Sequence, residues 1–138
     1  MRSSEPVFVD TGAWIALALA RDPLHTQARE IWETLQGVGA RLRTSVPVVL
    51  ETFTFLDRNI ARDVALGWKD SLSEVAGLRI LTVRPEDLEE AWPYFRRRNL
   101  HKLSAVDATS FVLMTRAKIR TAFAFDHHFA AAGFRLAG

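Results

Sequence analysis

The stretch VFVDTGAWIALALA, residues 7–20, reads first as a buried strand and then as a helix, and it places one acid, Asp10, where the two meet. A short run of hydrophobic, β-branched and aromatic residues is typical of a strand inside a sheet. Parallel α/β sheets bind their ligands beyond the carboxyl ends of their strands. The stretch therefore predicts the start of an α/β fold, in which Asp10 either caps the following helix or contributes to a site.

The rest of the chain continues this alternation of short strands and longer helices. Beside a first strand at residues 6–10, strands are predicted at residues 41–45, 78–83 and 121–126, with a short edge strand at residues 134–136. Helices are predicted at residues 22–36, with Asp22 as N-cap, at 84–98, with a kink at Pro93, and at 103–118, apolar nearly all round and therefore buried. The pattern predicts a single domain, residues 1–138, built as a three-layer α/β/α sandwich around a central, mainly parallel sheet of four to five strands.

Composition limits the class of protein. The 138 residues are 49% hydrophobic and 25% charged, which is typical of a globular domain and not of a disordered chain. Apolar runs stay short of the roughly 20 residues that a membrane helix needs. Glu5 and Asp10 interrupt the N-terminal segment, which disfavours a signal peptide. The lack of cysteine excludes disulfides and thiolate metal sites, and we expect a cytoplasmic protein; the net charge of +2 permits a nucleic-acid partner without requiring one.

Three further acids are predicted near the sheet edge that carries Asp10. Asp126 ends another predicted strand, Asp107 lies in the first turn of the buried helix, and Glu51 lies one turn into the helix after the second strand. Clustered carboxylates repel one another, so a fold that gathers four of them needs a cation or bound protons. Oxygen ligands without cysteine favour Mg²⁺ or Mn²⁺. The pattern therefore predicts metal-assisted hydrolysis of a phosphodiester.

Each acid also has a purely structural interpretation. Asp10 and Asp126 are candidate helix N-caps, and Glu51 is a candidate solvated helix residue. Ser104 and Asp107 have the spacing of a capping box. The joint occurrence of four acids at one predicted sheet edge favours a site over four independent structural roles.

Four stretches in this order resemble the PIN-domain nucleases, and most closely the VapC-type toxins of toxin–antitoxin pairs: VFVDTGAWIAL, TSVPVVLETFTFL, LSAVDATSFVLM and FAFDHHFAAAGFRL. The resemblance covers essentially the whole chain. It implies a metal-dependent endoribonuclease with these catalytic acids: Asp10, Glu51, Asp107 and Asp126. Asp10, Asp107 and Asp126 would bind Mg²⁺ or Mn²⁺, with Thr11 and Ser104 in support. It also implies cleavage of tRNA or rRNA, an antitoxin partner and a homodimer.

Some sequence features leave two interpretations open. His127 and His128 stand where some relatives carry a further acid, and we expect them to begin a short surface helix rather than to bind metal. The basic run at residues 96–102 either contacts an RNA backbone or interacts with the dipole of a helix C-terminus; its cations are Arg96, Arg97, Arg98 and Lys102.

The large apolar residues permit similar alternatives. Four tryptophans are predicted as core and interface anchors rather than base-stacking platforms: Trp14, Trp32, Trp68 and Trp92. Phe53, Phe55 and Leu56 lie on a helix that is apolar on several sides, which is consistent with a partner contact and equally with burial in the core.

Other protein classes fit less well. Asp-Thr-Gly also occurs in aspartic proteases, but that fold is all-β and rich in glycine turns, whereas this chain has 7 glycines and long helical patterns. An aspartate-dependent phosphatase would carry a second acid where Gly12 stands, and a receiver domain would carry an acidic pair and a late lysine. A catalytically silent PIN-like module that binds RNA or protein is the remaining alternative, although such modules usually lose acids that this chain keeps.

Overall fold

The computed structural model describes residues 5–138 and contains one five-stranded sheet. Its strands are β1 (Pro6–Val9), β2 (Arg41–Ser45), β3 (Leu78–Leu81), β4 (Thr121–Phe123) and β5 (Arg135–Leu136). They lie in the order β3-β2-β1-β4-β5, and every pair of neighbours is parallel. The predicted α/β architecture with a sheet of four to five mainly parallel strands is confirmed.

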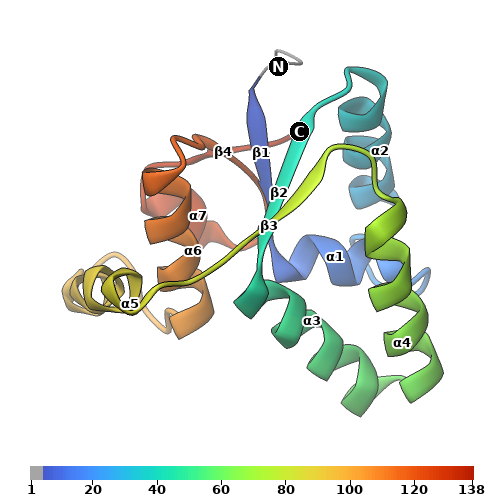
Figure 1. Cartoon of the computed structure of the whole chain (residues 1–138), viewed down its shortest axis with the longest axis horizontal. Helices are drawn as coiled ribbons and strands as arrows, with labels where there is room; N and C mark the ends of the chain where they lie inside the picture. Colours follow the sequence, from blue (N-terminus) through green and yellow to red (C-terminus); the bar gives the residue numbers. More distant parts are fainter. Residues whose placement is uncertain (1–4) are drawn as a thin grey trace.

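Helices cover both faces of the sheet and complete the three layers (Figure 1). The α-helices are α1 (Thr11–Ala18), α2 (His25–Gly37), α3 (Val46–Asn59), α4 (Arg62–Ser71), α5 (Pro85–Ala91), α6 (Ala105–Arg116) and α7 (His127–Ala131). Two 3₁₀ helices, η1 (Leu72–Glu74) and η2 (Trp92–Arg96), extend α4 and α5. In Figure 1, α1, α2 and α4 lie to one side of the strands, and α5, α6 and α7 lie to the other.

Side chains alternate between these two layers along each strand. On β2, Thr44 is fully buried and its hydroxyl accepts a hydrogen bond from the indole nitrogen of Trp14 at 3.2 Å, which places Thr44 under α1. Arg43, the preceding residue, therefore points to the opposite face, which it shares with its register partner Phe8 on β1. This alternation decides which residues of β2 belong to the core and which remain at the surface.

Helix α6 is buried on nearly every side, as its apolar composition predicts. Every residue from 107 to 114 is buried, including the polar Thr109 and Ser110. The hydroxyls of these two residues donate to backbone carbonyls one turn earlier, at 2.8 and 3.0 Å, so burial leaves neither without a partner. Phe111 packs edge-on against Phe129 of α7, with ring centroids 5.0 Å apart. The helix that carries Asp107 is thus held rigidly in the core.

Two helix boundaries show how local signals are used. Helix α2 begins at His25, so the prediction that Asp22 is its N-cap is wrong. The Asp22 carboxylate instead accepts a hydrogen bond from the backbone N–H of Leu24 at 2.8 Å, in a turn before the helix. Pro93 acts as predicted: α5 ends at Ala91, and the chain continues as η2.

Three of the four tryptophans are anchored in the core, and the fourth is not. The Trp14 ring lies 5.8 Å from that of Trp32 and 6.0 Å from that of Trp68. Trp92, the first residue of η2, is 50% exposed and its ring lies beside that of Phe95. Trp92 is therefore not a core residue, and its role as an interface anchor stays a prediction. No helix within residues 5–138 is long and apolar enough to cross a membrane.

Candidate active site

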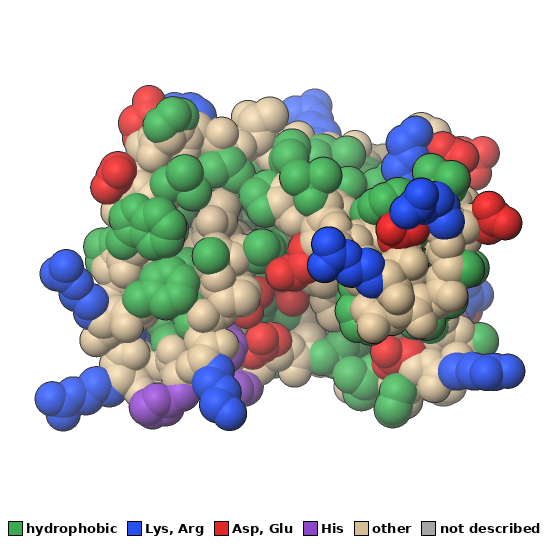
Figure 2. Space-filling view, turned by 90° about the horizontal axis from the view of Figure 1, so that it is seen from below, with side chains coloured by type: hydrophobic (Ala, Val, Ile, Leu, Met, Phe, Trp, Pro, Cys, Tyr) green, Lys and Arg blue, Asp and Glu red, His purple; other side chains and the backbone are tan. Residues whose placement is uncertain are grey.

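The four predicted acids meet at the carboxyl edge of the sheet. Asp10 follows β1 directly and Asp126 follows β4, while Glu51 lies on α3 and Asp107 in the first turn of α6. β1 is the central strand and pairs with β4, so the parallel order brings Asp10 and Asp126 to the same end. Figure 2, which looks at this end of the molecule, shows acidic side chains gathered near the middle of the face with apolar side chains on both sides.

Burial makes the first and third acids difficult to ionise. Asp10 is 4% exposed, and desolvation raises its pKa to about 7, helped by the charges of Glu51 and Asp126 and partly offset by the backbone N–H groups of Thr11 and Gly12. Desolvation also raises the pKa of Asp107, and the charges of Asp10 and Asp126 raise it further. Mutual electrostatic influence of this kind shows that the carboxyl groups share one environment.

Asp126 behaves in the opposite way because donors surround it. Its Oδ1 accepts from the backbone N–H of His128 at 2.8 Å, so it caps α7, and its N-cap interpretation is correct. Desolvation opposes ionisation, but hydrogen bonds from the backbone and ring of His128 outweigh it and lower the pKa of Asp126. In the interacting pair, Asp107 therefore retains the proton and Asp126 the charge.

The capping interpretations of the other acids have different outcomes. Asp10 occupies the N-cap position of α1, but its side chain makes no capping hydrogen bond. Ser104 is the N-cap of α6, and its hydroxyl accepts from the backbone N–H of Asp107 at 3.0 Å. Ser104 therefore fixes the start of the helix, while the Asp107 carboxyl group remains directed at the other acids. Glu51 is partly buried rather than fully solvated.

His128 is a member of the site that the sequence interpretation missed. The helix start at His127 is as predicted, but the expectation of a surface position fails for His128, which is 5% exposed. Its Nδ1 lies 2.8 Å from Asp126 and 3.7 Å from Asp107, and its Nε2 faces the carbonyl oxygen of His101. A carbonyl can only accept, so Nε2 donates to it, while Nδ1 faces the acids. Only the three-dimensional neighbours of His128 distinguish it from the exposed His127.

The donor set fits a divalent cation. Asp10 Oδ1 is buried and has no hydrogen-bond partner among the described residues, and the same holds for the Thr11 hydroxyl beside it. An unpartnered buried acceptor costs about 1–3 kcal/mol, which a cation at that oxygen would offset. Asp10, Asp107 and Asp126 are close enough to influence one another's pKa values, and their carboxylates supply the hard oxygen ligands that Mg²⁺ and Mn²⁺ prefer. Asp126, His127 and His128 also offer three ligand atoms within 4.8 Å of one another.

A cavity of about 600 Å³ adjoins the acids between α3 and the first turn of α6. Glu51 contributes to its wall, together with Pro47, Leu50, Thr54, Phe55, Arg58, Asn59 and Val106. Phe55 is 39% exposed on this cavity, whereas Leu56 is fully buried and Phe53 packs against the core. Phe53, Phe55 and Leu56 were predicted either to contact a partner or to lie in the core, and only Phe55 faces outward.

The basic run lies beside α7 and is exposed. Arg96 ends η2, and Arg97 donates through Nη2 to the carbonyl oxygen of Ala131 at 3.3 Å while its guanidinium lies 5.6 Å from the centre of the Tyr94 ring. Arg97 therefore has a structural role in joining η2 to α7. Arg96, Arg98 and Lys102 are exposed, and their predicted contact with RNA stays a prediction.

Comparison with known proteins agrees with this geometry. The model of the PIN domain family matches residues 7–135. The 23S rRNA-specific endonuclease VapC20 of Mycobacterium tuberculosis, in strains CDC 1551 / Oshkosh and ATCC 25618 / H37Rv, is 40% identical over 134 residues, covering 93% of this chain and 95% of that protein. The crystal structure of Mycobacterium tuberculosis VapC20, a sarcin–ricin loop cleaving toxin, matches with a TM-score of 0.81 and 34% identity over 93% of this chain and 95% of that one. The chain therefore belongs to the PIN domain family, and its predicted resemblance to the VapC-type toxins is confirmed.

Proposed function

We propose that this chain is a metal-dependent endoribonuclease, the toxin of a toxin–antitoxin pair, and that its substrate is ribosomal RNA. The observation that carries the proposal is the pair of buried aspartates, Asp10 and Asp107, whose pKa values are raised by burial and by neighbouring acids, with one Asp10 oxygen unpartnered. A relative that is 40% identical over nearly the full length of both chains cleaves 23S rRNA, which supports the choice of substrate.

Each acid has a distinct role in the proposed mechanism. Asp10 and Asp107 hold Mg²⁺ or Mn²⁺ directly, and Asp126, kept ionised by His128, completes the negative cluster. Glu51 faces the adjoining cavity and accepts a proton from the attacking water. Ser104 supports the site by holding the backbone at Asp107, and the unpartnered hydroxyl of Thr11 lies beside Asp10. A divalent ion, when bound, neutralises charge on the phosphate and lowers the pKa of water.

The surface next to the acids suggests how partners bind. The cavity beside Glu51, with Leu50 62% and Phe55 39% exposed, offers an apolar surface to a segment of an antitoxin, and occupation there would block the approach to Glu51. Arg96, Arg97, Arg98 and Lys102 are proposed to contact RNA phosphates. As parts of the same proposal, the chain acts as a homodimer, and it acts in the cytoplasm, where ribosomal RNA is found.

Replacement of Asp10 or Asp107 by Asn tests the proposal most directly. Asn keeps the shape of the side chain and removes the charge, so cleavage of a labelled rRNA hairpin in Mg²⁺ or Mn²⁺ should fall by about 10²–10³-fold. Asp70→Asn is the matched control, because the Asp70 side chain is 72% exposed and pairs only with its neighbour Lys69. Thermal unfolding of each variant checks the fold.

Two outcomes would contradict the metal-dependent mechanism, and two others would overturn further parts of the proposal. One is undiminished turnover in Asp10→Asn or Asp107→Asn. The other is cleavage by the unaltered protein that is equally fast in EDTA. Binding without any cleavage would favour the catalytically silent PIN-like module, and preferential cutting of tRNA would overturn the choice of ribosomal RNA.

A further inference from the structure

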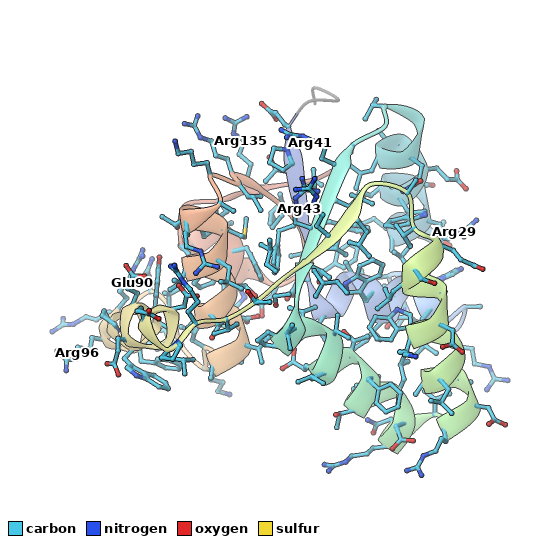
Figure 3. The ribbon with its side chains drawn as sticks, viewed as in Figure 1. Arg29, Arg41, Arg43, Glu90, Arg96 and Arg135 are labelled. Atoms are coloured by element: carbon cyan, nitrogen blue, oxygen red, sulfur yellow. The ribbon has the colours of Figure 1, made fainter. Side chains whose placement is uncertain are left out.

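Two neighbouring strands place arginines side by side, away from the acids. Arg43 of β2 is the register partner of Arg79 of β3, and paired residues on parallel strands point to the same face. Arg41 precedes Arg43 by two residues on β2 and therefore lies on that face as well. Figure 3 shows Arg41 and Arg43 toward the amino-terminal ends of the strands, opposite the carboxyl edge where the acids meet. We call these three residues the arginine strip.

The pairing of Arg43 with Arg79 is electrostatically unfavourable within the chain. Like charges directly opposite one another on adjacent strands are destabilising. Arg43 is partly buried, and its Nη1 donates only to backbone carbonyl oxygens, of Leu42 at 2.8 Å and of Gly77 at 3.1 Å. Desolvation lowers the pKa of Arg43, and the charges of Arg79 and Arg41 lower it further. Within residues 5–138, Arg43 and Arg79 make no ion pair with a carboxylate.

Basic residues continue from the strip along the same end of the sheet. A cavity of about 440 Å³ is lined by Lys118, Arg120 and Arg135, and the five other residues of its wall include no acid. Arg135 begins β5, and Figure 3 shows it at the same end of the molecule as Arg41 and Arg43. Cations therefore gather at this end of the sheet, although Glu5, just before β1, lies there too and the net charge of the chain is only +2.

We propose that the arginine strip is a second contact for the RNA substrate, which binds backbone phosphates away from the bond that is cut. The inference rests on the proposed function for the identity of the ligand as RNA. A polyanion spaced along two strands would relieve the repulsion between Arg43 and Arg79, and guanidinium groups match phosphate oxygens through paired donors. Contacts of this kind orient the nucleic acid without reading its sequence.

Geometry indicates the length of RNA that the contact requires. Arg41 lies four residues before Ser45, the last residue of β2, which is about 13 Å from the carboxyl edge at roughly 3.3 Å per residue. RNA that reaches both the acids and the strip must therefore extend beyond the cut. The contact would favour a substrate that continues past the cut over one that ends there.

The test is binding of a structured rRNA hairpin to the double variant R43Q/R79Q, measured by fluorescence anisotropy in EDTA so that no cutting occurs. Removing two phosphate contacts should weaken binding about tenfold near physiological salt and reduce the slope of log K against log salt by about 1.4–1.8. The double variant R43K/R79K keeps both charges and should retain the salt slope.

Arg29→Gln is the matched control for charge. Arg29 lies on α2 at the far side of the molecule, its side chain is 53% exposed, and it pairs with Glu33 one turn along the helix (Figure 3). This variant loses a positive charge outside the strip and should bind the hairpin as the unaltered protein does. Thermal unfolding of R43Q/R79Q should occur at the same or a higher temperature, because a repulsive pair is removed, so weaker binding cannot be ascribed to unfolding.

The outcomes separate this inference from the proposed function. Three results would overturn the strip as an RNA contact. The first is unchanged binding by R43Q/R79Q, and the second is a loss of affinity per charge in Arg29→Gln as large as that in R43Q/R79Q. The third is a lack of binding by the unaltered protein. If the proposed function is wrong, the unaltered protein will not cleave RNA in Mg²⁺ or Mn²⁺. The binding measurement in EDTA does not depend on cleavage, so it still tests whether the strip contacts RNA. Retained RNA binding together with lost affinity for an acidic peptide would assign the strip to a protein partner and also overturn it.

Discussion

Asp87 and Asp10 are both buried aspartates, and they differ in what surrounds them. Asp87 is fully buried on α5, and its carboxylate accepts from the backbone N–H of Arg84 at 2.8 Å and from the guanidinium of Arg116. Desolvation works against ionisation there, but these donors lower the pKa of Asp87. Among residues 5–138, no cationic side chain pairs with Asp10, and its pKa is raised to about 7.

The difference distinguishes a structural acid from a functional one. Asp87 receives its counter-charge from the chain itself, and Arg116 also donates to the carbonyl oxygen of Thr82, so the pair joins α5 to α6 and to the end of β3. Asp10 instead faces further carboxyl groups, and one of its oxygens has no partner among the described residues. A buried charge that the chain leaves uncompensated indicates a cation supplied from outside.

The largest expected effect on stability lies at Asp87. Asp87→Ala leaves Arg116 and the backbone of Arg84 without their acceptor, and we expect the free energy of unfolding to fall by about 3 kcal/mol. Asp10→Asn removes repulsion and desolvation and should leave that free energy unchanged or raise it. Urea denaturation of the metal-free proteins measures both. Equal destabilisation by the two substitutions would remove the distinction between a structural and a functional acid.

The pH dependence of stability should have opposite signs for the two acids. The raised pKa keeps the Asp10 proton in the folded state up to about pH 7, whereas the unfolded chain releases it near the ordinary aspartate pKa of 3.8, so the folded state binds more protons between these values. Stability of the metal-free protein should therefore decrease as pH rises from 5 to 8, and Asp10→Asn should flatten this decrease. The contribution of Asp87 is instead present above its unfolded pKa and is lost as pH falls through its lowered value.

Melting temperatures across that pH range, with and without Mn²⁺, measure this effect. Proton release from Asp10 favours cation binding, so the stabilisation by Mn²⁺ should grow as pH passes about 7. A metal-free melting temperature that rises steadily from pH 5 to 8 and is unaffected by Asp10→Asn would contradict the assignment.

The smallest effect is expected at His128, which acts through Asp126. His128→Ala removes the ring that lies 2.8 Å from Asp126 and should weaken Mn²⁺ binding about tenfold, as loss of an outer partner of a ligand typically does. Mn²⁺ titrations followed by thermal shift give the affinity. His127→Ala is the comparison and should lose less affinity, because the His127 side chain is 79% exposed and its Nδ1 lies 3.7 Å from Asp126. If His128→Asn recovers part of the Mn²⁺ affinity that His128→Ala loses, a hydrogen-bonding role of His128 is supported. Equal losses of Mn²⁺ affinity in His127→Ala and His128→Ala would contradict a specific role of His128.

Part of the site could be predicted because its signals are local. Asp10 at the end of an apolar run and Asp107 three residues after Ser104 mark positions that a parallel sheet brings to one edge. The burial of His128 could not be predicted in this way. It depends on the contact between α7 and the loop at His101, which lies 27 residues away in the chain. His127 has the same local sequence signal and is exposed.

The arginine strip shows the same limit at the level of the sheet. Arg43 and Arg79 are 36 positions apart, and only the register of β2 against β3 makes them neighbours. A shift of this register by one residue would move Arg79 to the opposite face and remove the repulsion. Similarly, the sequence left open whether each tryptophan lies in the core or at an interface, and only the structure shows that Trp92, next to the break at Pro93, is at the surface.

The amino-acid sequence by itself determined the class of fold, the order of strands and helices and the acids at the strand ends, because hydrophobic periodicity and capping act between residues close in the chain. Tertiary structure alone decided which carboxyl group holds a proton, which histidine is buried and which arginines face one another. Desolvation and Coulomb interactions depend on neighbours in space, and these neighbours are brought together only when the sheet and its helices pack.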